Sequence, residues 1–345
     1  MSPDLPPSSV AVVDLAPYTN GEGDAEARQA AAQAFDAACR GSGFVAAKLP
    51  LGGVTAELAA RAFAAAKELF GLPEEAKLGG LRRLTSETNC GYSPLASEAL
   101  DRARGPDSKE AFNVRKRGVH RNDYSGCPEG FRAVAEELWD ALEAAARRMA
   151  ECAAAALGLG DEAFFARALR RWDQTTLRFL HYPPCDWRGG EPPVRCGAHT
   201  DFGMLTVLLV LEGEEGLQIK RVEGASVSDA EAGGAGWRTA ELPRDTSRAV
   251  VNTGALLARW TNDVYRATAH RVVVPTAEAA QRHRYSIAFF VDPDADAVVS
   301  AHPSLVPKGE RPKYPPVSGR EYLLGKLREA HDGGREDAKR RRREE

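Results

Sequence analysis

From Thr175 onward, the sequence is a series of short runs rich in Val, Ile, Leu, Thr and Phe, which Gly, Pro, Asn and Asp separate. Runs of this composition, bounded by turn residues, predict the short strands of an all-β sandwich or barrel. Their number, about eight, suggests a jelly roll. The runs are TTLRFLHY, RCGAHT, MLTVLLVL, GLQIKRV, WRTAEL, RAVVNTGALLARWT, ATAHRVVVP and HRYSIAFFV. This pattern constrains the fold more than any other feature of the chain.

The chain before Thr175 is predicted to be mainly helical. Residues 25–40 form an Ala-rich helical pattern that two glycines follow, and a second helix is expected to begin after Thr55, as its N-cap, and to stop at Gly71. The longest helix is expected within PEGFRAVAEELWDALEAAARRMAECAAAALGLG, and a short strand within SSVAVVDLAPY. Between the second and the longest helix, residues 79–123 form a polar, Gly-containing stretch.

These patterns together predict an α+β protein with a jelly-roll core and a mainly helical N-terminal region packed on it. The expected divisions follow the changes in composition and predicted secondary structure along the chain. They are an N-terminal helical region at 1–120, long supporting helices at 121–174, the jelly-roll core at 175–300 and a C-terminal extension with a charged tail at 301–345.

The bulk composition describes a globular protein without a strong charge imbalance. The 345 residues are 43% hydrophobic, and 46 basic against 49 acidic side chains give a net charge of −3. This balance argues against a broad electrostatic footprint for nucleic acid or an anionic membrane. No apolar run reaches the roughly 18 residues of a membrane span. Six scattered cysteines without a C-x-x-C pair favour a reduced, cytoplasmic setting. We expect a small-molecule substrate; the oligomeric state stays open.

The stretch GAHTDFGMLTVLLVL places a His-x-Asp pair just before an uninterrupted apolar run. Burying an imidazole and a carboxylate is costly unless something compensates them, and a bound cation does so. His199 and Asp201 are two residues apart, so on an extended strand both side chains face the same way. His270, in another strand-like run, is the best third ligand. Two imidazoles and one carboxylate leave open positions on a metal, as in non-haem Fe(II) oxygenases.

A second pair of polar residues shares a strand face further along. Arg284 and Ser286 lie in RYSIAFF. An inward guanidinium in a barrel is expensive unless it meets an anion, and its planar fork suits a carboxylate. The other histidines are expected to be hydrogen-bonded or at the surface. They are His120, His181, His283, His302 and His331.

These motifs resemble the 2-oxoglutarate and Fe(II)-dependent dioxygenase superfamily, in its isopenicillin N synthase-like branch. The resemblance covers nearly the whole chain. Segments such as GSGFVAAKL and FGLPEEAKL look like the helical N-terminal region of that branch, and LHYPPC, HTDFGMLTVLL, VVNTGALLARWTND, YRATAHRVVVP and RYSIAFF look like its double-stranded β-helix core. The resemblance implies Fe(II), with 2-oxoglutarate and O2 as co-substrates, and oxidation of a small organic metabolite by hydroxylation or desaturation.

Carried over position by position, the resemblance assigns His199, Asp201 and His270 as iron ligands. It assigns Arg284 and Ser286 to the distal carboxylate of 2-oxoglutarate, and the hydroxyl of Tyr182 to the same site. Many plant members carry an asparagine where this chain has Leu180, so one polar contact of the co-substrate pocket is missing or comes from another residue.

Two residues are candidates for substrate contacts. Arg178 has the same strand parity as Tyr182, so it either meets an anion inside the barrel or forms a salt bridge at the rim. Phe290 shares the face of Arg284 and matches a position where some relatives stack a flat substrate, although core packing is the simpler explanation for a strand phenylalanine.

Two other functions stay open at this point. An oxidase of isopenicillin N synthase type would use the same arginine, serine and tyrosine on its substrate without 2-oxoglutarate. A non-catalytic binding relative would keep the barrel without turnover. A structural zinc site fits poorly, because two histidines and one aspartate do not complete a tetrahedron.

Two further segments are uncertain in role. Residues 224–236 are expected to be a solvated loop between two strands rather than an active-site lid. The five consecutive basic residues 339–343 are expected to be a solvated tail rather than a nuclear-import or nucleic-acid tag.

Overall fold

The computed structural model describes residues 10–85, 88–101, 103–211, 215–220, 236–240 and 248–326. The predicted loop at 224–236 falls outside these residues except for Gly236, and the basic tail at 339–343 lies outside them entirely.

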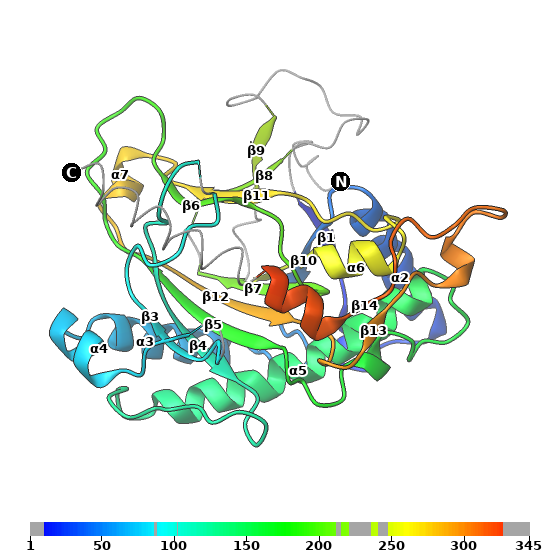
Figure 1. Ribbon diagram of the computed structural model, residues 1–345, viewed down its shortest axis with the longest axis horizontal. Coiled ribbons are helices and arrows are strands. Elements are labelled where there is room, and N and C mark those ends of the chain that lie inside the picture. Colours follow the sequence, from blue (N-terminus) through cyan, green and yellow to red (C-terminus); the bar gives the residue numbers. More distant parts are fainter. Residues whose placement is uncertain are drawn as a thin grey trace.

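Two β-sheets face each other and form the core of the molecule (Figure 1). The larger sheet has eight strands in the order β1-β2-β10-β7-β12-β5-β4-β3, and the smaller has four in the order β6-β11-β8-β9. This is the jelly-roll core that the sequence predicts. The strands of the two sheets are β1 (Ala11–Val13), β2 (Phe44–Lys48), β3 (Gly91–Ser93), β4 (Glu110–Arg115), β5 (Thr176–Tyr182), β6 (Val194–His199), β7 (Leu205–Val210), β8 (Leu217–Lys220), β9 (Trp237–Thr239), β10 (Arg248–Thr253), β11 (His270–Val273) and β12 (Arg284–Val291).

Helices cover the outer face of the larger sheet, below it in Figure 1. Residues on strand β12 alternate accordingly: Ile287 and Phe289 belong to the main hydrophobic core with the helices, whereas Ser286 and Phe290 line a cavity between the sheets. A further hairpin, β13 (Val298–Val299) with β14 (Val317–Ser318), follows the core. The helices are α1 (Ala16–Thr19), α2 (Ala25–Arg40), α3 (Ala56–Phe70), α4 (Glu74–Gly80), α5 (Phe131–Ala156), α6 (Ala255–Trp260) and α7 (Ala277–Ala280).

The three main helix predictions are confirmed, and their ends follow from capping. Helix α2 begins after Asp24, whose carboxylate accepts a hydrogen bond from the Ala27 amide at 3.0 Å. Helix α3 begins after Thr55, whose hydroxyl accepts from the Leu58 amide at 3.1 Å. These side chains satisfy amides that have no partner within the first helical turn. Helix α5 is the longest described helix, at 26 residues.

The N-terminal part is less purely helical than its sequence indicates. Strands β1 to β4 come from it and extend the larger sheet at both edges. Strand β4 lies in the stretch read as polar, and all six of its residues are buried. Its charged side chains are of a type that usually marks an exposed segment, which obscured the strand pattern. In the structure they are buried in polar contacts. The division of the chain at residues 120, 174 and 300 stays a prediction.

A second difference concerns the run RAVVNTGALLARWT. Its first part is strand β10, but its second part is helix α6. The change occurs at Gly254, where an added Cβ would lie 2.3 Å from the carbonyl oxygen of Gly203, so only glycine allows the chain to turn there. After this turn, the buried Leu256, Leu257 and Trp260 follow helical spacing.

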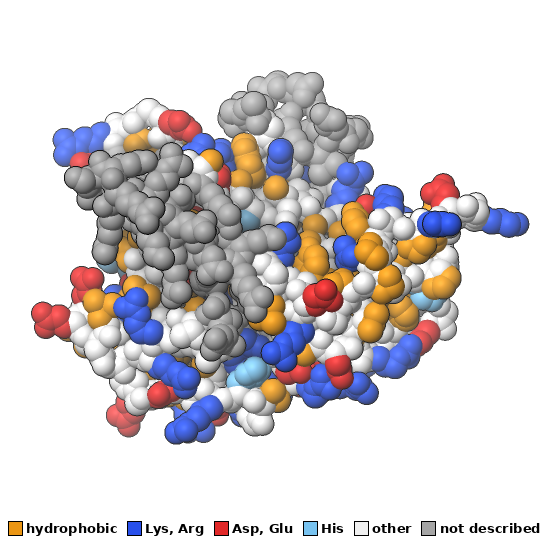
Figure 2. All heavy atoms as spheres, in the orientation of Figure 1, with side chains coloured by type: hydrophobic (Ala, Val, Ile, Leu, Met, Phe, Trp, Pro, Cys, Tyr) orange, Lys and Arg blue, Asp and Glu red, His pale blue; other side chains and the backbone are white. Residues whose placement is uncertain are grey.

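The visible surface is mixed in charge. Basic and acidic side chains are interspersed over the face shown in Figure 2, and hydrophobic side chains gather at its right, where Figure 1 places α6. Among the described residues, no helix is both long and apolar enough to cross a membrane.

Candidate metal and co-substrate site

The structure brings His199, Asp201 and His270 together at one end of the smaller sheet. His199 ends strand β6 and His270 begins strand β11, where the two residues are direct partners in the antiparallel ladder. The Nε2 atoms of both histidines lie 3.7 Å from Oδ1 of Asp201. One ligand atom from each residue lies within 4.8 Å of the others. Two imidazole nitrogens and a carboxylate oxygen at such spacing fit a divalent iron ion.

Hydrogen bonds orient all three side chains. The Nδ1 atom of His199 donates to the carbonyl of Gly197 at 2.8 Å, and Nδ1 of His270 faces the carbonyl of Thr268 at 3.3 Å. Each ring therefore turns its Nε2 atom toward Asp201. The side-chain amide of Asn252 donates to Oδ2 of Asp201 at 2.7 Å, which leaves Oδ1 toward the imidazoles. Such outer contacts fix the tautomer and direction of metal ligands.

The protonation states suit a cation. Burial, together with the neighbouring His270, lowers the pKa of His199 well below its usual range. Burial alone would raise the pKa of Asp201, but the two imidazoles and hydrogen bonds from Asn252 and Thr206 outweigh it and hold that pKa below its usual value. Neutral imidazole and ionised carboxylate are the forms that bind metal.

A cavity of about 190 Å³ opens beside these three residues, between the two sheets. Tyr182, Arg284 and Ser286 line it from strands β5 and β12, where Arg284 pairs with Tyr182 in the ladder. Arg284 is only 2% exposed, and its guanidinium carbon lies 4.9 Å from the centre of the Tyr182 ring. Burial raises the pKa of Tyr182, so its hydroxyl stays a donor.

The buried guanidinium of Arg284 is incompletely satisfied within the described part of the chain. Its Nε atom donates to the carbonyl of Glu215 at 3.2 Å, while Nη1 has no hydrogen-bond partner. A buried donor without a partner costs free energy, which a carboxylate bound in the cavity offsets. The side chains of Arg284, Ser286 and Tyr182 thus fit the distal carboxylate of 2-oxoglutarate. Leu180, beside Ser286 in the ladder, is buried and lines the same cavity, so this position contributes an apolar surface.

Both candidate substrate residues line the cavity. Phe290 projects from strand β12 on the same face as Ser286. Arg178 is not at the rim: its Nη2 atom donates to both carboxylate oxygens of Glu98, at 2.7 and 2.6 Å, and the two side chains are 14% and 11% exposed. No sequence pattern selects Glu98, because it lies 80 positions before Arg178 in an irregular segment.

Further polar residues of the cavity were also missed. Strand β4 and the segment before it contribute Lys109, Asn113 and Arg115, and strand β12 is followed by Asp292. For two of them a signal was present: FNVR alternates apolar and polar residues, as on a half-buried strand, which puts Asn113 and Arg115 on one face. Burial raises the pKa of Asp292 to about 8, with Asp201 adding to the rise and Arg115 opposing it.

The remaining described histidines are hydrogen-bonded, as expected. His181 contacts Glu110 and His283, each at 2.7 Å, and His120 contacts the carbonyl of Asp173 at 2.8 Å. His302 contacts the hydroxyl of Ser304 at 2.7 Å. His331 lies outside the described residues.

Comparison with known proteins agrees with this geometry. The model of the 2OG-Fe(II) oxygenase superfamily matches residues 173–293, and that of the non-haem dioxygenase in morphine synthesis N-terminal region matches residues 10–129. The 2-oxoglutarate-Fe(II) type oxidoreductase hxnY of Emericella nidulans is 31% identical over 98% of this chain and 93% of its own. The 2-oxoglutarate-Fe(II) type oxidoreductase ppzD of Metarhizium rileyi is 29% identical over 86% of this chain and 85% of its own.

A solved structure shares the fold over nearly the whole chain. A Neurospora crassa protein, crystallised in complex with alpha-KG and thymine, is 26% identical with a TM-score of 0.77, and the match covers 93% of this chain and 97% of that one. The same protein was also solved in complex with alpha-KG. The chain belongs to the 2-oxoglutarate and Fe(II)-dependent oxygenase superfamily, and is a dioxygenase that uses Fe(II), 2-oxoglutarate and O2.

Proposed function

We propose that His199, Asp201 and His270 hold the Fe(II) and that Arg284, Ser286 and Tyr182 bind the distal carboxylate of 2-oxoglutarate. The observation that carries this proposal is the pairing of two sites in one cavity. A carboxylate lies 3.7 Å from each of two imidazoles, and a buried guanidinium nitrogen in the same cavity lacks a partner among the described residues.

Fe(II), when bound with 2-oxoglutarate, supplies the O2 activation that couples oxidative decarboxylation to oxidation of a substrate C–H bond. The chain's own residues bind and orient. Arg284 supplies charge and paired donors for the far carboxylate, and its burial makes that interaction strong. Leu180 and Phe290 add apolar walls that exclude water from the co-substrate and substrate.

We place the prime substrate beside Phe290 and the polar residues of strand β4, and expect hydroxylation or desaturation of a small, flat molecule. Glu98 already neutralises Arg178, so this guanidinium offers hydrogen bonds rather than an unmatched charge to the substrate. Asn113, whose side-chain carbonyl is buried without a partner among the described residues, supplies an acceptor. The thymine bound by the Neurospora crassa protein, a small flat ring with donors and acceptors, supports this class.

The cytoplasmic location stays a prediction of the cysteine usage. All six cysteines are free thiols, which supports a reducing compartment.

The test is an anaerobic titration of the Fe(II)-loaded protein with 2-oxoglutarate, monitored by the visible metal-to-ligand charge-transfer band that bidentate chelation produces. We expect a saturable band in the wild type. In Arg284→Met, we expect the 2-oxoglutarate affinity to fall by roughly 30-fold or more, because removing one partner of a buried charge pair costs about 2–5 kcal/mol. Arg147→Met is the matched control, since Arg147 bonds the Leu169 carbonyl away from the cavity.

Unchanged affinity in Arg284→Met would refute the assignment of the co-substrate carboxylate. Loss of iron in Asp201→Ala, with the fold retained by circular dichroism, is expected from the ligand assignment. Normal iron binding in that variant would refute it. Oxygen uptake should require added 2-oxoglutarate.

A further inference from the structure

Strand β6 carries a bulge immediately before the metal site. His199 pairs with His270 and Cys196 pairs with Val272, so three residue steps on β6 face two steps on β11. A β-bulge of this kind bends the strand and takes backbone groups out of the ladder. The residue after Cys196 is Gly197, and its backbone groups make contacts outside the regular ladder.

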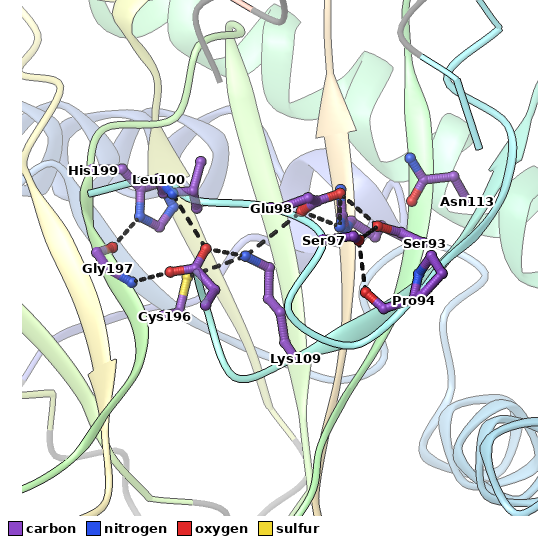
Figure 3. A network of polar contacts seen from close by, with 12 residues as sticks. Ser93, Pro94, Ser97, Glu98, Leu100, Lys109, Asn113, Cys196, Gly197 and His199 are labelled. Carbon is purple, nitrogen blue, oxygen red and sulfur yellow. Dashed lines mark hydrogen bonds and ion pairs between the residues drawn. The ribbon is translucent and has the colours of Figure 1, made fainter. Parts of the chain in front are cut away.

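Both backbone groups of Gly197 are engaged by side chains. Its amide donates to Oδ1 of Asp107 at 2.8 Å, and its carbonyl accepts from Nδ1 of His199 at 2.8 Å (Figure 3). A Cβ at this position would lie 2.8 Å from the backbone nitrogen of Asp101, so glycine is required for the approach of the segment that carries Asp107. The position of Gly197 therefore determines where His199 finds its acceptor.

The carboxylate of Asp107 is held in place by Lys109. The ammonium of Lys109 donates to Oδ2 of Asp107 and lies 3.6 Å from Glu98, which pairs with Arg178. Figure 3 shows the ammonium of Lys109 between Glu98 and Cys196. Asp107 and Lys109 are 4% and 5% exposed. Ion pairs buried to this degree are expensive to build, so the geometry that they impose requires an explanation.

We propose that Asp107, held by Lys109, is a positioning residue for the iron ligand His199. It fixes the bulge through the Gly197 amide and thereby the carbonyl that orients the His199 ring. This inference rests on the proposed role of His199 as an iron ligand. Outer groups that orient a ligand typically contribute about 10- to 100-fold in metal affinity.

A positioning role and a purely electrostatic role of Lys109 predict opposite effects of its replacement on Fe(II) affinity. Lys109 is a cation near the iron site, and its charge opposes protonation of His199. If its charge alone mattered, Lys109→Met would strengthen the binding of a divalent cation, because a repulsive charge is removed. A positioning role predicts weaker Fe(II) binding in Lys109→Met, because Asp107 loses its ion-pair partner and no longer fixes the bulge at Gly197.

The experiment measures the Fe(II) dissociation constant anaerobically, by competition with a chelating indicator, on the full chain. We expect about 10-fold or greater weakening in Lys109→Met and in Asp107→Ala. Asp107→Asn keeps an oxygen that can accept a hydrogen bond from the Gly197 amide, so its Fe(II) affinity should fall less than that of Asp107→Ala. The free energy of unfolding of each metal-free variant is measured by denaturant titration alongside.

Lys77→Met is the matched control. Lys77 lies on helix α4 and forms a buried ion pair with Glu110 of strand β4, at 2.9 Å. Breaking this pair should destabilise the fold to a similar degree while leaving Fe(II) affinity within about twofold, since neither partner bonds to a proposed iron ligand.

The outcomes distinguish this inference from the ligand assignment on which it rests. His199→Ala must lose iron if His199 is a ligand; retained affinity there refutes the proposed function itself. If His199→Ala loses iron but Lys109→Met binds Fe(II) as tightly as the wild type or more tightly, the positioning role is overturned and the ligand assignment stands. Equal weakening in Lys77→Met and Lys109→Met also overturns it, because general destabilisation would then account for the effect.

Discussion

Replacing Asn252 with alanine should weaken metal binding more than its effect on the fold accounts for. Asn252 lies on strand β10, is 4% exposed, and donates to Oδ2 of Asp201 at 2.7 Å. The other carboxylate oxygen, Oδ1, faces the two imidazoles. Asn252→Ala thus leaves the side chains of His199 and His270 intact and removes one of the contacts that fix Asp201.

Two magnitudes follow from this geometry. A hydrogen bond to a charged group contributes about 1.5–3 kcal/mol, which is the expected loss in the free energy of unfolding of the metal-free protein. The expected loss in metal affinity is about 10- to 100-fold. At a metal concentration of about 100 times the wild-type dissociation constant, bound metal adds about 2.7 kcal/mol to stability. A 30-fold weaker site would add only about 0.9 kcal/mol by the same relation.

The assay is denaturant unfolding under anaerobic conditions, with and without Fe(II), for wild type and Asn252→Ala. The informative quantity is the gain in unfolding free energy upon adding metal, since it cancels the damage to the metal-free fold. Asn262→Ala serves as the control. Asn262 is also buried and makes two hydrogen bonds to backbone groups of Leu305 and Lys313, but it does not line the cavity. An equal metal-induced gain in wild type and Asn252→Ala would refute the argument.

Three further outcomes are expected. Ser286→Ala should weaken 2-oxoglutarate binding by roughly 10- to 150-fold, the effect of one hydrogen bond to a charged group, in the charge-transfer titration. Trp139→Ala should cost about 3–5 kcal/mol in denaturant unfolding and leave Fe(II) affinity unchanged, because Trp139 is buried under the larger sheet with its ring 5.1 Å from that of Phe289. Burial opposes ionisation of Glu110, but hydrogen bonds from neighbours including Lys77 hold its pKa below the usual 4.5. A carboxyl group whose pKa is lower in the folded state stabilises the fold at pH values above its unfolded pKa. This stabilisation is lost as the pH falls through the folded pKa. Glu110→Gln should therefore lower stability at neutral pH and flatten its decline below about pH 4.5 in unfolding curves.

The sequence predicts best those features that repeat within one element. Alternation on strand β12 places Arg284, Ser286 and Phe290 on one face, and the structure has all three lining the cavity. The His-x-Asp spacing likewise brings two candidate ligands to one place. The third, His270, needed only the assumption that a later strand returns to the same sheet, and it is paired directly with His199.

Features that depend on contacts between distant segments could not be predicted in this way. Glu98 and Asp107 lie in irregular chain, and their partners Arg178 and Gly197 are 80 and 90 positions away. Lysines and acidic residues are exposed in most proteins, so nothing in SKEAFNVR signals that Lys109 is buried. The helix α6 was missed because the apolar run continues past the turn at Gly254 without a break in composition.

The same buried charges separate the stability of this fold from its chemistry. Replacing a buried ion pair by apolar side chains of similar volume is often neutral or stabilising. A chain with an apolar pair at Asp107 and Lys109 could therefore fold, but the amide of Gly197 would lose its acceptor at the bulge. The ring of His199 would then rely on the carbonyl of a residue whose amide has lost its bond to Asp107. Stability alone does not require this ion pair, whereas the proposed positioning of His199 toward iron does.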